Sequence, residues 1–177
     1  MRQKNPPNYL AGYPLTLTGK VKELIEQGEL AQRLMQRYPA AHNVRTDRAL
    51  YEYVEKIKDR YLRNAGNLSR VAYDSSLQVM RNALGVHISR GQGANLKNRR
   101  EILVAGVFRN APPEFLRMIV VHEVAHFRER EHNKSFYQLC LHMEPEYHRL
   151  EFDLRAYLTY LAAQGAPLWL SVRPDAG

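Results

Sequence analysis

The segment from residue 113 to residue 127 constrains the fold of this chain more than any other part of the sequence. Pro112 and Pro113 suit the first turn of a helix, where a missing N–H group costs nothing. Apolar residues then give the helix a broad hydrophobic face: Phe115, Leu116, Ile119, Val120, Val124 and Phe127. Two histidines and a glutamate lie in the middle of the segment. Burying such polar groups is costly without a partner, so we expect them to share one.

The two histidines and the glutamate form the HExxH pattern of zinc hydrolases, His122-Glu123-Val124-Ala125-His126. Residues four apart share one face of a helix, so both imidazoles can reach a single metal ion. Glu123 can reach a metal-bound water without binding the metal itself, which is the general-base position in metalloproteases. The pattern therefore predicts one zinc ion (Zn²⁺) per chain, with Glu123 as the catalytic base. The alternative is a surface helix that carries incidental histidines.

A catalytic zinc ion has three protein ligands and leaves the fourth position to water. His132 lies ten residues after His122, which is the spacing of the third histidine in the HExxHxxGxxH metzincins. Glu129 occupies the position of the metzincin glycine, so metzincin membership does not follow. The rival third ligands are glutamates of the following region: Glu144, Glu146 and Glu151. A further alternative leaves His132 as a loop histidine in solvent.

The length and composition suit one globular domain over residues 1–177, because 45% of the residues are hydrophobic and no long apolar run occurs. The basic N-terminus is not followed by a continuous apolar stretch. We therefore expect neither a signal peptide nor a membrane span, and a cytoplasmic location follows by default. The single cysteine, Cys140, can form no internal disulfide and is expected in the core. The sequence does not define an oligomeric state.

Lys and Arg outnumber Asp and Glu by 26 to 18, which gives a formal net charge of +8 and a pI near 9.7. This charge favours polyanions as partners or substrates at low salt. Basic residues are not interleaved with aromatic ones as in single-strand binding platforms, so nucleic-acid binding is allowed by the charge but not indicated by the sequence. Most of the cations are expected to form a solvated surface.

We expect an α+β fold with the element order of a minimal zincin-like domain. A helical N-terminal part covers residues 1–69, and a small antiparallel sheet covers residues 70–109. The HExxH helix and the C-terminal helices cover residues 110–165. This order places the sheet directly before the HExxH helix.

Several helix boundaries can be predicted from local signals. Helical spacing over residues 20–38 is interrupted at Gly28, which predicts two short helices. Thr46 is a good cap for a further helix. After the HExxH helix, Asn133 could cap another, and residues 147–161 form the last.

The middle part of the chain has the pattern of short strands. A turn at residues 74–76 separates two of them, from residue 71 to residue 80. Residues 84–89 and 101–108 are predicted to form an antiparallel hairpin around a glycine-bearing loop. The second strand of the hairpin is nearly continuously apolar, so we expect it to be buried on both faces.

Two kinds of substrate contact are conceivable in this region. An edge strand of the sheet could align an extended peptide across the metal by β-augmentation. Five cations could instead bind the phosphates of a substrate: Arg90, Lys97, Arg99, Arg100 and Arg128. Alternatively, these cations are ordinary loop charges that are solvated and bind no substrate.

Further segments carry a resemblance to a known family. They are Leu50-Tyr51-Glu52-Tyr53, Val107-Phe108-Arg109-Asn110-Ala111-Pro112, Phe115-Leu116-Arg117-Met118-Ile119-Val120-Val121-His122-Glu123, Glu131-His132-Asn133-Lys134 and Phe136-Tyr137-Gln138-Leu139-Cys140. With them the chain resembles the YgjP-like metallopeptidase family of metal-dependent hydrolases. The resemblance implies a minimal zincin fold, zinc ligation by His122, His126 and His132, and Glu123 as the catalytic glutamate. Many members of the wider family have Trp-Gly-Ser-Cys before the hairpin, where this chain has Leu84-Gly85-Val86-His87, so no function is transferred to that stretch.

These observations predict a zinc-dependent hydrolase with an HExxH-x5-H site, in which zinc activates water and Glu123 takes its proton. HExxH chemistry favours a peptide substrate. The resemblance includes a member described as a UTP pyrophosphatase, and the positive charge agrees with a nucleotide substrate. A third hypothesis is a non-catalytic basic module with structural zinc that binds nucleic acid. Structural sites usually have four protein ligands, so the three histidines and the intact Glu123 argue against it.

Overall fold

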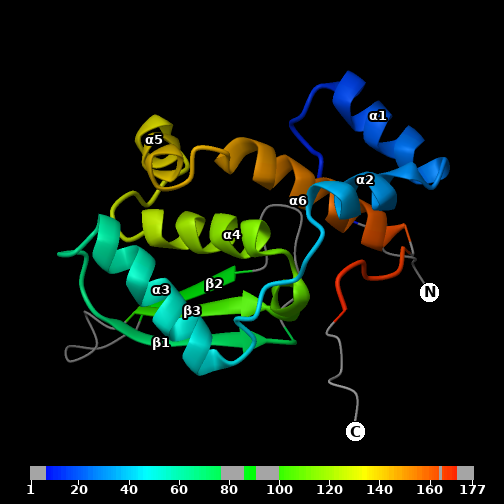
Figure 1. Cartoon of the computed structure of the whole chain (residues 1–177). Coiled ribbons are helices and arrows are strands. Elements are labelled where there is room, and N and C mark those ends of the chain that lie inside the picture. Colours follow the sequence, from blue (N-terminus) through cyan, green and yellow to red (C-terminus); the bar gives the residue numbers. More distant parts are fainter. Residues whose placement is uncertain (1–6, 77–85, 91–99, 164, 171–177) are drawn as a thin grey trace, which may run out of the picture.

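The computed structural model describes residues 7–76, 86–90, 100–163 and 165–170, and for residues 86–90 it describes the backbone alone. These residues form helices and a small sheet, as expected of an α+β fold (Figure 1). The buried hydrophobic side chains, from Leu10 to Trp169, pack into a common core. No helix within the described ranges is long and apolar enough to cross a membrane.

Within the described residues, three helices precede the sheet, as predicted. α1 (Leu15–Glu26) begins ahead of its predicted start, and α2 (Glu29–Arg37) follows after a break at Gly28. The φ angle of Gly28 is 71°, in the left-handed region that glycine adopts without strain. α3 (Asp47–Tyr61) begins after Thr46, whose hydroxyl accepts a hydrogen bond from the amide of Ala49 at 3.1 Å.

The sheet is mixed, so the prediction of an antiparallel sheet was wrong in part. β1 (Leu68–Asp74), β2 (Val86–Arg90) and β3 (Arg100–Ala105) are arranged in the order β1-β3-β2. β3 pairs antiparallel with β2, as expected of the hairpin, but parallel with β1. In the central position, the backbone groups of the apolar β3 are paired on both sides. No tight turn joins β1 to β3, so nothing forces that pair to be antiparallel.

The strand predicted over residues 101–108 ends earlier than expected. β3 stops at Ala105, and a 3₁₀ helix, η1 (Gly106–Asn110), follows it. This turn buries Phe108 completely and leads the chain into the HExxH helix. Leu103 is only half-buried, so β3 is less evenly buried on its two faces than predicted.

The turn predicted at residues 74–76 is confirmed by a local hydrogen bond. The carboxylate of Asp74 accepts a hydrogen bond from the amide of Ser76 at 2.8 Å. The strand predicted directly after this turn and the loop of the predicted hairpin lie outside the described residues.

The HExxH helix, α4 (Pro113–Ala125), lies at the centre of the molecule. The sheet lies on one side of it, and α5 (Lys134–Met143) and α6 (Tyr147–Ala162) lie on the other (Figure 1). Every residue of α4 from Met118 to Ala125 is buried. This burial excludes the alternative of a surface helix with incidental histidines.

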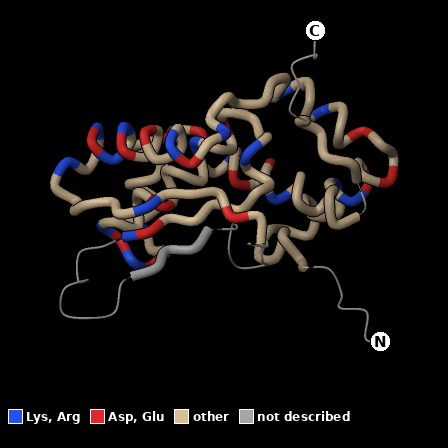
Figure 2. Tube along the Cα trace, turned by 90° about the horizontal axis from the view of Figure 1, so that it is seen from below, with Lys and Arg blue, Asp and Glu red and all other residues tan. Residues whose placement is uncertain are grey.

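Acidic and basic residues are mixed along the described helices (Figure 2). Several form ion pairs one turn apart, such as Lys20 with Glu23 and Arg33 with Glu29. Pairs of this kind are typical of a solvated surface and contribute little to stability. Most of the described cations therefore agree with the expected solvated surface, whereas Lys58 is buried.

Candidate metal centre

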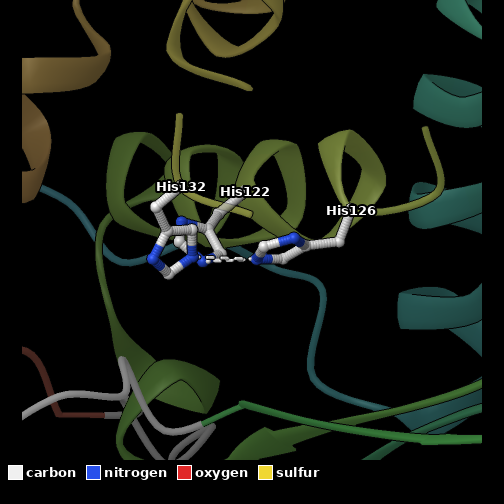
Figure 3. Close-up of side chains that lie close together, drawn as sticks. All are labelled: His122, His126 and His132. Carbon is white, nitrogen blue, oxygen red and sulfur yellow. Dashed lines mark hydrogen bonds between the residues drawn. The ribbon is translucent and has the colours of Figure 1, made fainter. Parts of the chain in front are cut away.

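Three histidine side chains meet at the C-terminal end of α4. His122 lies in the last turn of the helix, His126 is its C-terminal cap, and His132 lies in the segment that leads to α5. Figure 3 shows their ring nitrogens turned toward one another. The Nε2 atom of His126 lies 3.2 Å from Nε2 of His122 and 3.0 Å from Nε2 of His132. Potential ligand atoms of all three lie within 4.8 Å of one another.

The ring of His126 is held by a backbone group. Its Nδ1 atom lies 2.9 Å from the carbonyl oxygen of Glu129. A carbonyl oxygen only accepts hydrogen bonds, so Nδ1 carries the proton and Nε2 of the neutral ring presents a lone pair to the other histidines. The carbonyl comes within reach because the chain turns directly after α4, where the amides of Arg128 and Glu129 donate to the carbonyl of Ala125.

The ring of His122 is held by a side chain. The residue is 8% exposed, and the Nδ1 atom of its ring lies 2.7 Å from the hydroxyl oxygen of Tyr147 at the start of α6. Burial, and after it the nearby His126 and His132, lower the pKa of His122 well below its ordinary value. The ring is therefore neutral near pH 7, which is the form that binds metal ions.

The apolar ring of Phe136, on α5, packs against all three histidines. Its ring centroid lies 5.0 Å from that of His122, 4.6 Å from that of His126 and 4.8 Å from that of His132. Phe136 is completely buried. Because a tightly packed neighbour restricts rotation, this ring helps to fix all three imidazoles.

Glu123 lies beside the histidines and is 6% exposed. Its Oε1 atom is 3.9 Å from Nε2 of His122. Burial raises the pKa of Glu123 to about 8. A cation bound at the histidines would favour the charged form of this carboxylate.

The three Nε2 atoms fit a metal ion. The single lone pair on Nε2 of His126 can accept a hydrogen bond from one neighbouring ring at most, whereas a cation can bind the lone pairs of all three. Tetrahedral zinc with Zn–N distances of about 2.0–2.1 Å places its nitrogen ligands about 3.3 Å apart, close to the separations of 3.2 and 3.0 Å that Nε2 of His126 makes with the other two rings. His132 is exposed, so the site is open to solvent on its side.

Comparison with known proteins agrees with this geometry. Residues 3–157 match the family described as YgjP-like, metallopeptidase domain. The chain belongs to this family. A UTP pyrophosphatase of Escherichia coli (strain K12) is 54% identical over 156 residues, which is 87% of this chain and 93% of that protein. No solved structure matches the chain.

Membership of the YgjP-like family makes the chain a hydrolase, and its three histidines could form a metal site. The rival ligands predicted from the sequence are engaged elsewhere. They form the ion pairs Arg117–Glu144 at 2.8 Å, Arg149–Glu146 at 2.9 Å and Arg155–Glu151 at 3.1 Å. In the described part of the chain, none of these glutamates joins the histidine group.

Two of the five predicted phosphate-binding cations can be placed. The guanidinium of Arg100 lies over the ring of Phe127, with its Cζ atom 4.3 Å from the ring centroid. Phe127 follows His126 directly, so Arg100 lies near the end of α4 that carries the histidines. Arg128 is exposed on the same turn. Lys97, Arg99 and the side chain of Arg90 lie outside the described residues.

Three features of the site were missed by the sequence-based predictions. The carbonyl of Glu129 is a backbone group, which no motif of side chains reveals. Phe136 and Tyr147 lie far enough from His122 in the chain that only the fold brings them together. The spacing of Tyr147 and Glu151 on one face of a helix was a signal that could have suggested a polar pair.

Proposed function

We propose that this chain is a zinc-dependent hydrolase in which His122, His126 and His132 bind one zinc ion. The convergence of their three Nε2 atoms carries this proposal. Three imidazoles are the ligand set of known catalytic zinc sites, and the fourth position remains for water. We also propose a zincin-like arrangement within a single domain, because the HExxH helix packs on a small sheet in a common core.

When bound, zinc would lower the pKa of a coordinated water toward about 7 and polarise an oxygen of the substrate. Glu123 acts as the general base. Its carboxylate lies beside Nε2 of His122 and takes the proton of the attacking water. The buried surroundings keep bulk solvent from this carboxylate, so the proton is held for transfer to the leaving group.

We propose a nucleoside triphosphate, with UTP as the main candidate, as the substrate. The relative named UTP pyrophosphatase, which is 54% identical, supports this choice. Water would attack one phosphorus of the α–β phosphoanhydride of UTP, and the bond to the bridging oxygen would break. The products are UMP and pyrophosphate. Glu123 passes its proton to the oxygen of the leaving group.

The charge of the chain agrees with a triphosphate substrate. Arg100 and Arg128 lie at the end of α4 that carries the histidines, where the phosphates would have to bind. The net charge of +8 adds a longer-range attraction, which salt would weaken.

The decisive experiment compares wild type with Glu123→Gln. Pyrophosphate release is measured from UTP, CTP, ATP and GTP with zinc-loaded protein. We expect Glu123→Gln to lower the rate on the preferred nucleotide by about 10²- to 10⁴-fold while the zinc content stays the same. Glu146→Gln is the matched control, because this exposed glutamate pairs only with Arg149 among the described residues. Equal release by wild type and Glu123→Gln would identify a contaminant and remove the nucleotide proposal.

A peptide is the second candidate substrate, and the position of β2 favours it. β2 is at the edge of the described sheet and lies next to α4 (Figure 1). An extended peptide could pair with this edge and cross the metal site. Cleavage of an unfolded protein by wild type but not by Glu123→Gln, without hydrolysis of any nucleotide, would select the peptide. The non-catalytic nucleic-acid module is not proposed, because the family is one of hydrolases.

A further inference from the structure

A series of polar side chains on α6 leads away from the metal site: Tyr147, Glu151 and Arg155. The hydroxyl of Tyr147, a completely buried residue, contacts Nδ1 of His122 at 2.7 Å. Glu151 lies one turn further along α6, and its charge is close enough to raise the pKa of Tyr147. Arg155 donates from Nε and Nη2 to Oε1 of Glu151 at 3.2 and 3.1 Å. Its Nη1 atom donates to the carbonyl oxygen of Tyr9 at 3.1 Å. Glu151 is thus held in place from the N-terminal segment.

The direction of the hydrogen bond between His122 and Tyr147 follows from the convergence of the Nε2 atoms. Nε2 of His122 faces His126, so a neutral His122 that binds metal through Nε2 carries its proton on Nδ1 and donates it to the hydroxyl of Tyr147. The hydroxyl can then donate its own proton to Glu151. Burial, and after it the charge of Glu151, raise the pKa of Tyr147, so the hydroxyl stays protonated.

We propose that Tyr147 is a positioning residue that holds the proton of His122 on Nδ1 and orients the ring for metal binding, with Glu151 as the acceptor behind it. This inference rests on the metal site of the proposed function. Glu151, a rival ligand in the sequence-based prediction, acts on the metal only through Tyr147. His126 has the same kind of support from a backbone carbonyl, which substitution of a side chain cannot remove. The support of His122 can be removed by mutation.

Tyr147→Phe tests the proposal, because it removes one oxygen and keeps the ring. The affinity for zinc is measured by competition with a chromophoric chelator. Loss of an outer hydrogen bond to a metal-binding histidine typically weakens metal binding about 10- to 100-fold, and we expect a change of this size. Tyr157→Phe is the matched control. Tyr157 is also buried on α6, and its hydroxyl accepts a hydrogen bond from the amide of Leu168 at 3.4 Å. The control should bind zinc as wild type does.

A second measurement separates positioning from packing. Nitrogen-15 NMR of the metal-free protein reports which ring nitrogen of His122 carries the proton. We expect Nδ1–H in wild type and in Tyr157→Phe, and a larger share of Nε2–H in Tyr147→Phe. A purely structural role for Tyr147 would lower thermal stability but leave the zinc affinity and the nitrogen signals unchanged, and that result would overturn the inference.

Glu151→Gln provides a test that leaves Tyr147 intact. The amide oxygen can still accept the tyrosine proton, but without a charge it is a weaker acceptor, so we expect a smaller loss of zinc affinity than in Tyr147→Phe. Unchanged zinc affinity in Glu151→Gln would remove Glu151 from the proposal. This test does not depend on whether Tyr147→Phe folds. Wild type that binds no zinc would overturn the proposed function itself. Wild type that binds zinc no better than Tyr147→Phe would overturn only the role of Tyr147.

Discussion

The carbonyl oxygen of Glu129 accepts a hydrogen bond from Nδ1 of His126 at 2.9 Å, although Glu129 stands where metzincins have glycine. Only its backbone takes part in this contact. We therefore expect Glu129→Ala to bind zinc with the affinity of wild type, as measured by chelator competition. His126→Ala, which removes the ring itself, is the comparison and should bind zinc far more weakly. A large loss in Glu129→Ala would show that its carboxylate contributes to the site.

Removal of the His132 imidazole is expected to abolish stable zinc binding, because two ligands hold the ion much less tightly than three. Wild type should retain about one zinc per chain after dialysis, measured by elemental analysis. Glu144→Ala and Glu146→Ala should retain the same amount, because these glutamates pair with Arg117 and Arg149. His132 is exposed, so circular dichroism should show that His132→Ala is folded. Full retention of zinc by this variant would refute His132 as a ligand.

The helices were predictable because their signals are local. Gly28 breaks the first helical region, and its left-handed φ angle explains why glycine is suited to that position. Thr46 and Asn133 cap α3 and α5 through their own side chains. The HExxH spacing alone likewise predicts that His122 and His126 share one face of a helix. Such features depend on residues within about one helical turn.

The remaining features depend on contacts between distant residues. The parallel register that pairs Val71 with Ile102 is decided by which strand occupies the centre of the sheet, and no turn sequence encodes that choice. The hydroxyl of Tyr147 reaches His122 only because α6 packs on α4. Patterns within a helix or strand predict the face that is buried, but they do not name the residue that will be buried against it.

Replacement of Phe136 by leucine is expected to weaken zinc binding, because a smaller, differently shaped side chain packs less well against the three imidazoles. Phe115→Leu is the matched control. Phe115 is equally buried but packs on Tyr38 and Trp169. We expect both variants to lose roughly 1–2 kcal/mol of unfolding free energy. Only Phe136→Leu should also lose zinc affinity in the chelator assay. Equal zinc affinity in the two variants would show that Phe136 is an ordinary core residue.

His42 is expected to make the stability of the metal-free protein depend on pH. It is buried, with Nε2 lying 2.6 Å from the carbonyl oxygen of Phe108, while Nδ1 accepts a hydrogen bond from the amide of Val44 at 3.0 Å. The carbonyl requires the proton on Nε2, and the amide leaves no room for a second proton on Nδ1. Burial lowers the pKa of His42 from its ordinary value of 6.5.

Because the pKa of His42 is lower in the folded state, the unfolded chain binds a proton at this residue at a higher pH than the folded chain does. The free energy of unfolding should therefore fall as the pH drops below about 6.5 and level off below the folded-state pKa. His42→Gln loses these hydrogen bonds, so its free energy of unfolding at pH 7 should be lower by about 1–2 kcal/mol. Because glutamine cannot titrate, its free energy of unfolding should also fall less as the pH drops. Urea unfolding of the metal-free proteins from pH 7 to pH 5 measures both effects, and His148→Gln, at an exposed position, should keep the wild-type slope. Parallel curves for wild type and His42→Gln would exclude His42 as the source of the pH dependence.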